Sequence, residues 1–367
     1  MAHGDLRPRS RAMSSDIAFE THLDVAGESR LHQHLRHFWH PVAFSHDVSD
    51  DEPVQGELMG ERLAIWRHDG EVRVFRDLCR HRGASLALGR IDRGCIRCAY
   101  HGWAYSESGV VVDIPSRPGI AESLNVAVDS FPAAESAGIV WACLDREPRF
   151  PVPQLPVLDD PTYTHLFYET YDWRCSMARR VENYFDFSHF AHVHHGSLGD
   201  RDDAVVADYE VRRVGGEIRI NAGPFLEFTD NPKNEGLESG GGTYMAWKRY
   251  RIFMPNTMLL HSSAGPDGED YTLFVAVAPL APRLVRCFTI QSRNYAPDKD
   301  KEFREFQALI LGQDKPVVES QRPEELPDDL AGEMHVKGVD TGTLEYRRWL
   351  IEISNGHYEQ APAADGK

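Results

Sequence analysis

Two short stretches decide the fold of this chain: Asp77-Leu78-Cys79-Arg80-His81-Arg82-Gly83 and Cys98-Ala99-Tyr100-His101-Gly102-Trp103. The first contains Cys-x-His and the second Cys-x2-His, and the 16 residues 82–97 separate them. In each stretch one thiolate alternates with one imidazole, whereas zinc fingers usually pair Cys with Cys and His with His. Two loops that each give a Cys to one iron and a His to the other would hold a [2Fe–2S] cluster in this way.

The pattern therefore favours an iron–sulfur site over a zinc site. The metal-free alternative is a pair of buried thiols and two histidines that are satisfied within the core. Four such ligands seldom coincide by chance at two short spacings, so this alternative is the weaker one.

At these residues the chain resembles the Rieske non-haem iron oxygenases, the catalytic subunits of ring-hydroxylating and demethylating systems. The resemblance implies that Cys79 and Cys98 hold one iron of the cluster and that His81 and His101 hold the other. It extends over residues 35–355. The segments 37–42 and 313–321 resemble the O- and N-demethylase branch of the family.

Length and composition predict two soluble globular domains. The chain has 367 residues, of which 41% are hydrophobic and 26% charged, and a formal net charge of −17. This charge argues against nucleic acid or an anionic membrane as a partner. Residues 1–28 are expected to form a mobile leader, and no apolar region typical of a signal peptide follows the basic start. The chain has six cysteines, and the four outside the cluster loops show no regular spacing and need no disulfides, which fits a reducing cytoplasm.

The first domain, expected over residues 29–150, is predicted to be a small antiparallel β domain with the cluster loops at one tip. A short helix is predicted over residues 29–41, ending at Pro41. Its histidines, His32, His34, His37 and His40, face several directions and are interpreted as surface and capping residues. Asp69-Gly70, between two strand-like segments, predicts a tight hairpin.

The second domain is expected over residues 151–367, after a proline-rich connector. Strand-like segments and three helices, expected over 181–195, 299–322 and 344–353, predict an antiparallel sheet covered by helices. The fold class is therefore α+β. The family resemblance implies a helix-grip or START-like arrangement for this catalytic domain.

The helix expected over 181–195 carries four histidines and an aspartate within ten residues. A non-haem Fe(II) site requires two imidazoles and one carboxylate, with positions left open for O₂. Spacing alone does not choose the pair, because His189/His192 and His192/His195 share a helix face. The family motif Asp-x2-His-x4-His assigns the ligand role to His189 and His194.

The resemblance also gives Asp186 a role, as the link between His101 of one subunit and His189 of the next. The alternative is that Asp186 supports a ligand within its own chain. Asn183 precedes Asp186 by one turn and is expected to line the site. Asp314, which interrupts an apolar stripe of the late helix, is the predicted third iron ligand, and Glu319 is the rival.

These features predict a terminal oxygenase that uses O₂ and electrons from NAD(P)H, delivered by a separate ferredoxin or flavin reductase. The expected reaction is oxidative N- or O-demethylation of a methylated heterocycle or methoxyarene. The alternatives are a hydroxylase of an aromatic or polycyclic natural product, a non-catalytic Rieske electron carrier and a zinc-stabilised binding module. The family implies a homotrimer.

Overall fold

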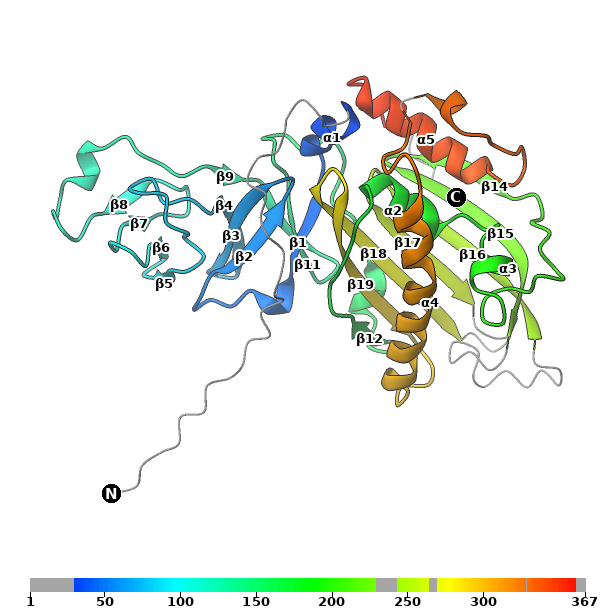
Figure 1. Ribbon diagram of the computed structural model, residues 1–367. Coiled ribbons are helices and arrows are strands. Elements are labelled where there is room, and N and C mark those ends of the chain that lie inside the picture. Colours follow the sequence, from blue (N-terminus) through cyan, green and yellow to red (C-terminus); the bar gives the residue numbers. More distant parts are fainter. Residues whose placement is uncertain (1–29, 229–242, 264–268, 328, 361–367) are drawn as a thin grey trace.

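The computed structural model describes residues 30–228, 243–263, 269–327 and 329–360, so the expected leader lies outside the described residues. The strands form four antiparallel sheets, and helices cover one face of the largest sheet (Figure 1). Within the described residues, none of the helices combines the length and the apolar composition that a membrane span requires. The α+β prediction is confirmed, whereas the domain boundary at residues 150/151 stays a prediction.

The chain begins with a shorter helix than the sequence predicts. Helix α1 (Arg30–His34) passes into a 3-10 turn, η2 (Leu35–His37), and strand β1 (His40–Phe44) already contains Pro41. A residue that precedes proline avoids helical backbone angles, which explains why the extended conformation begins at His40. The interpretation of the four histidines as surface and capping residues is wrong for two of them, since His32 and His40 are buried.

Three small sheets build the N-terminal part. One contains β1, β11 (Ile139–Ala142) and β10 (Ala133–Ser136); another contains β2 (Val54–Leu58), β3 (Glu61–His68), β4 (Glu71–Arg76) and β9 (Ser130–Phe131); the third contains β5 (Arg90–Asp92), β6 (Cys95–Arg97), β7 (Ala104–Tyr105) and β8 (Val111–Asp113). The hairpin prediction is confirmed, because Asp69 and Gly70 join β3 to β4 with φ of 51° and 79°. Such left-handed angles match the twist of a two-residue hairpin.

The largest sheet has eight strands in the order β12-β19-β18-β17-β16-β15-β14, with β13 also paired to β19. Its strands are β12 (Thr164–Phe167), β13 (Tyr171–Trp173), β14 (Glu210–Val214), β15 (Glu217–Phe228), β16 (Thr243–Phe253), β17 (Thr257–Ser263), β18 (Asp270–Ala281) and β19 (Leu284–Arg293). Strand β18 is buried on both faces, because β1 and β2 pack on the side away from the helices. This double burial explains its almost continuous apolar sequence.

The late helices agree with the sequence, and the early one does not. Helices α4 (Asp300–Ser320) and α5 (Thr341–Ser354) lie close to their predicted bounds. The single helix predicted over 181–195 is wrong, because the structure has α2 (Met177–Tyr184) and a one-turn helix α3 (Phe190–Val193) with a break between them.

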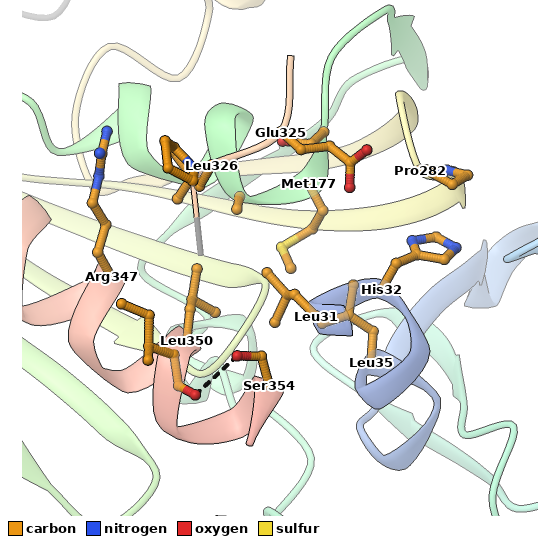
Figure 2. A pocket seen from close by; sticks show the side chains of 14 residues that line it. Leu31, His32, Leu35, Met177, Pro282, Glu325, Leu326, Arg347, Leu350 and Ser354 are labelled. Atoms are coloured by element: carbon orange, nitrogen blue, oxygen red, sulfur yellow. Dashed lines mark hydrogen bonds between the residues drawn. The ribbon is translucent and has the colours of Figure 1, made fainter. Parts of the chain in front are cut away.

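Helix α1 and the turn η2 dock on the C-terminal part of the molecule. Leu31 and Leu35 face Met177 of α2 and Leu350 of α5 around a small hollow (Figure 2). Beside this junction, the fully buried His40 accepts a hydrogen bond at Nδ1 from Asn256 Nδ2 (2.9 Å) and donates from Nε2 to Leu35 O (2.8 Å). One neutral imidazole thus connects β1 to the turn between β16 and β17.

We expect His40 to make the fold sensitive to acid. Burial lowers the pKa of His40 from 6.5 to about 4, so the unfolded chain binds this proton first. The neutral His40 contributes fully to the free energy of unfolding above pH 6.5. This contribution, up to roughly 3 kcal/mol, is lost as the pH falls toward 4. Urea unfolding at pH 7 and pH 5 should show a smaller pH dependence for His40→Gln than for the wild type. The exposed-site control His46→Gln should behave as wild type, and an unchanged pH dependence in His40→Gln would contradict the assignment.

Candidate metal centres

The two Cys/His loops have the same backbone design. Cys79 and Cys98 are each 2% exposed, and each begins a turn that a glycine closes. Gly83 N donates to Cys79 O (2.9 Å) and Gly102 N donates to Cys98 O (3.0 Å), with φ of 68° and 73° at the two glycines. Only glycine adopts these angles without strain, so the two turns present their cysteines in matching conformations.

The imidazoles of the two loops lie side by side. The rings of His81 and His101 are 4.5 Å apart, and Trp103 stacks on His81 at 4.7 Å with an interplanar angle of 4°. His81 Nδ1 is buried without a hydrogen-bond partner among the described residues. A buried polar atom normally has a partner, and a metal ion would supply one here. The loops therefore fit an iron–sulfur cluster.

Tyr105 is a further residue of this centre that the sequence analysis missed. Its hydroxyl accepts a hydrogen bond from Arg80 N (3.0 Å) and lies 3.0 Å from Cys79 Sγ. With its lone pair occupied by the amide, the hydroxyl is free to donate to the sulfur. Hydrogen bonds to cluster sulfurs adjust the reduction potential.

The second centre depends on the break between α2 and α3. Asp186 Oδ1 accepts hydrogen bonds from Ser188 N (3.0 Å) and Ser188 Oγ (2.7 Å), a local turn that competes with helical hydrogen bonding. A new helix, α3, therefore begins after this turn. His189 directly precedes its single turn and His194 directly follows it. Five residues apart, the two imidazoles converge to 3.2 Å between their Nε2 atoms.

Helix α4 brings a carboxylate to the same point. Asp314 Oδ1 lies 3.1 Å from His194 Nε2 and 3.5 Å from His189 Nε2, and Asp314 is 6% exposed. Donors about 2.1 Å from a first-row metal ion and at right angles to one another lie about 3.0 Å apart. The three atoms thus have the spacing of one face of a coordination octahedron, as a two-histidine, one-carboxylate iron site requires.

The other candidate ligands lie elsewhere. His192 and His195 are exposed on the outside of the turn. Glu319 Oε1 accepts a hydrogen bond from Arg174 N (2.8 Å), so the structure brings Asp314 and not Glu319 to the imidazoles.

Gln313 was also missed by the sequence analysis. Its Oε1 lies 2.8 Å from His194 Nδ1, which places a proton on Nδ1 and leaves Nε2 free for a metal. The only sequence signal was its position beside Asp314, and a role follows only from the docking of α4 against α3.

The protonation states of the donors suit a divalent cation. Burial lowers the pKa of His189, so its imidazole is neutral. Burial alone would raise the pKa of Asp314, but the hydrogen bond with His194, the electrostatic interactions with the two imidazoles and the positive charge of Arg180 hold it below its usual value. Metal binding requires neutral imidazoles and an ionised carboxylate.

The two predicted accessory residues each lie beside one member of the triad. Asp186 Oδ2 is 3.9 Å from His189 Nδ1, and the carboxyl group is about one-third exposed. Asn183 Nδ2 donates to Asp314 Oδ1 (3.3 Å), and Asn183 lines the cavity beside the triad.

A cavity opens directly on the three donors. It contains about 620 Å³ of empty space, a figure that includes its open mouth. Its walls are mainly apolar and aromatic, and they include Tyr184, Phe190, Leu260, Tyr271, Leu273, Phe306 and Ile310. Lys248 and Gln307, which are 2% and 6% exposed, add polar groups to the lining.

Comparisons with known proteins agree with this geometry. Residues 38–132 match the Rieske [2Fe-2S] domain, and residues 173–354 match the vanillate O-demethylase oxygenase C-terminal domain. The first match contains both cluster loops, and the second contains the triad.

Full-length relatives cover most of the chain. Methylxanthine N1-demethylase NdmA of Pseudomonas putida is 30% identical over 90% of this chain and 92% of its own length. Methylxanthine N3-demethylase NdmB of the same organism is 32% identical over 88% of this chain and 90% of its own length. The solved structure of NdmA with caffeine superposes with a TM-score of 0.78 over 90% of this chain and 94% of that one.

The triad predicts a selective loss of one metal. Asp314→Ala should release the iron of the second centre, since two imidazoles alone bind it weakly, while the two cluster irons and the cluster absorbance remain. Iron and acid-labile sulfide are measured on freshly purified protein. Glu319→Gln is the matched control and should retain all of its iron. If Asp314→Ala keeps its iron and Glu319→Gln loses it, the ligand is Glu319.

Proposed function

Because the chain belongs to the Rieske non-haem iron oxygenases, we propose that it is the terminal oxygenase of an oxidative demethylase. The observation that carries the proposal is the convergence of His189, His194 and Asp314 at the end of an apolar cavity, in a chain with both cluster loops complete. A separate reductase would supply electrons from NAD(P)H.

In this proposal each metal has its own residues. Cys79, His81, Cys98 and His101 hold the [2Fe–2S] cluster, and His189, His194 and Asp314 hold Fe(II). When bound, these groups deliver electrons and activate O₂, so that a methyl C–H bond becomes a hydroxymethyl group. The hydroxymethyl product then releases formaldehyde and leaves the demethylated heteroatom. The chain itself orients the substrate and limits the access of water.

The cavity supports a small methylated heterocycle as the substrate. Aromatic walls suit a flat ring, and the Lys248 ammonium and the Gln307 amide can donate hydrogen bonds to ring carbonyl oxygens. Two relatives with full-length similarity are methylxanthine demethylases.

The arrangement of the two centres favours electron transfer between subunits. The cluster loops are joined to the sheet β5–β8. This sheet and the segment around α3 lie at opposite ends of the folded molecule (Figure 1). We therefore infer that the cluster of one subunit serves the iron of a neighbour, in a homotrimer. Asp186, partly exposed beside His189, would connect the partner subunit's cluster to this iron.

A non-catalytic electron carrier is the alternative from another class. A carrier would need only the cluster loops, whereas this chain also holds a buried triad that opens on a cavity. We further infer a cytoplasmic location, since none of the six cysteines forms a disulfide, as in a reducing compartment.

A substrate panel tests the proposed reaction. The iron-loaded protein, supplied with NADPH and a generic ferredoxin reductase, is incubated with N-methylated xanthines, methoxybenzoates and a polycyclic hydrocarbon. We expect formaldehyde in proportion to demethylated heterocycle, and none from Asp314→Ala. Hydroxylated product without formaldehyde would favour the hydroxylase, and cluster reduction without any oxidation of substrate would favour the carrier.

Replacement of Asp186 tests the relay. Asp186→Asn keeps the Oδ1 acceptor of the Ser188 turn and removes the charge, so both metals should stay while oxidation of the reduced cluster slows by about 10- to 100-fold. Stopped-flow absorbance of the cluster in a single turnover measures this step. Ser188→Ala, which removes only the hydroxyl hydrogen bond, is the control and should react at nearly the wild-type rate. A wild-type rate in Asp186→Asn would exclude the relay.

A further inference from the structure

Arg180 places a buried positive charge beside the proposed iron site. The residue is 1% exposed, and its guanidinium lies over the indole of Trp173 with Cζ 4.5 Å from the ring centre. Nη2 donates to Tyr171 OH and Nη1 donates to Asn183 Oδ1, both at 3.0 Å. Since a guanidinium keeps its proton in proteins, this side chain brings a full charge to the cavity wall.

The hydrogen bond from Arg180 fixes the orientation of the Asn183 amide. An asparagine amide can present either its oxygen or its NH₂ group to a neighbour. With Oδ1 held by Arg180, Nδ2 faces Asp314 and donates to Oδ1, the carboxylate oxygen nearest to His194 Nε2. The opposite orientation would bring two oxygens together and repel the carboxylate. Arg180 thus holds Asp314 through Asn183.

The pairing of Arg180 differs from that of the other buried arginines. Arg179 forms an ion pair with Glu333, Arg293 with Asp300, and Arg347 with Glu182. Among the described residues, no carboxylate lies within 4 Å of the Arg180 guanidinium. Arg180 is instead linked to a carboxylate through one amide, because it donates to Asn183, which in turn donates to Asp314. An unneutralised charge acts over a longer distance in a poorly solvated site than in water.

We infer that Arg180 is a positioning residue that orients Asp314 through Asn183 and whose charge raises the reduction potential of the mononuclear iron. The inference rests on the proposed iron site and adds a residue that acts without touching the metal. A fixed positive charge opposes the gain of charge when Fe(II) loses an electron to become Fe(III). The ferrous form, which reacts with O₂, is therefore favoured.

The test separates the charge of Arg180 from its hydrogen bonds. Arg180→Gln can still donate to Asn183 but carries no charge, and Arg180→Lys keeps the charge but lacks the planar fork. Arg293→Gln is the matched control, because Arg293 is also fully buried and lies 4.3 Å from an aromatic ring, that of Phe303, but does not line the cavity. Cluster absorbance and iron per chain show whether each variant is folded and loaded.

The readouts are the midpoint potential of the mononuclear iron and the electron paramagnetic resonance spectrum of its ferrous nitrosyl complex, both without substrate or turnover. In Arg180→Gln the one-electron equilibrium should shift at least tenfold toward Fe(III), a potential lower by 59 mV. Arg180→Lys should keep the potential and change the nitrosyl spectrum, and Arg293→Gln should change neither.

A wild-type potential in fully loaded Arg180→Gln, or an equal shift in Arg293→Gln, would overturn the inference. If Arg180→Gln does not fold, Arg180→Lys decides, because a wild-type nitrosyl spectrum there would show that the fork does not orient the ligand. Failure of the iron site itself is distinguishable, since Asp314→Ala would then retain all of its iron.

Discussion

The turn that Asp186 forms with Ser188 is the local constraint on which the oxygen-activating half of the molecule depends. Two hydrogen bonds to one carboxylate oxygen interrupt a segment that would otherwise continue as a helix. In an unbroken helix, residues 189 and 194 would point about 140° apart. The interruption instead places the His189 imidazole before and the His194 imidazole after a single helical turn, and their Nε2 atoms lie 3.2 Å apart. The same carboxylate keeps its second oxygen near His189, so one side chain both forms the turn and lies beside a ligand of the site.

Packing between distant segments completes what this turn begins. Strand β18 is covered on one face by the N-terminal sheets and on the other by helix α2, against which α4 packs. Amides of the N-terminal part bond to this strand, as Met59 N does to Pro279 O (2.8 Å). The two halves consequently share one hydrophobic core, and the position of α4 against α3 is fixed through the sheet beneath them.

The residues of the site differ in how far the sequence could predict them. Cys79, His81, Cys98 and His101 follow from spacing, because each pair is local and its chemistry is specific to metal binding. The choice of His189 and His194 required the family motif, since helical periodicity favoured other pairs and a turn formed by a side chain leaves no periodic signal. Gln313 and Tyr105 were missed because their roles depend on contacts between distant segments. Arg180 was missed because an arginine within a short helix usually faces solvent.

The burial of three of the four cysteines outside the cluster loops has a consequence for a protein that handles dioxygen. Cys143, Cys175 and Cys287 are at most 1% exposed, and burial raises the pKa of Cys143 to about 11 and that of Cys175 to about 12. Thiols, unlike thiolates, react slowly with peroxide. Any hydrogen peroxide formed near the iron site would therefore meet protonated, shielded sulfur at these three positions and would oxidise them slowly.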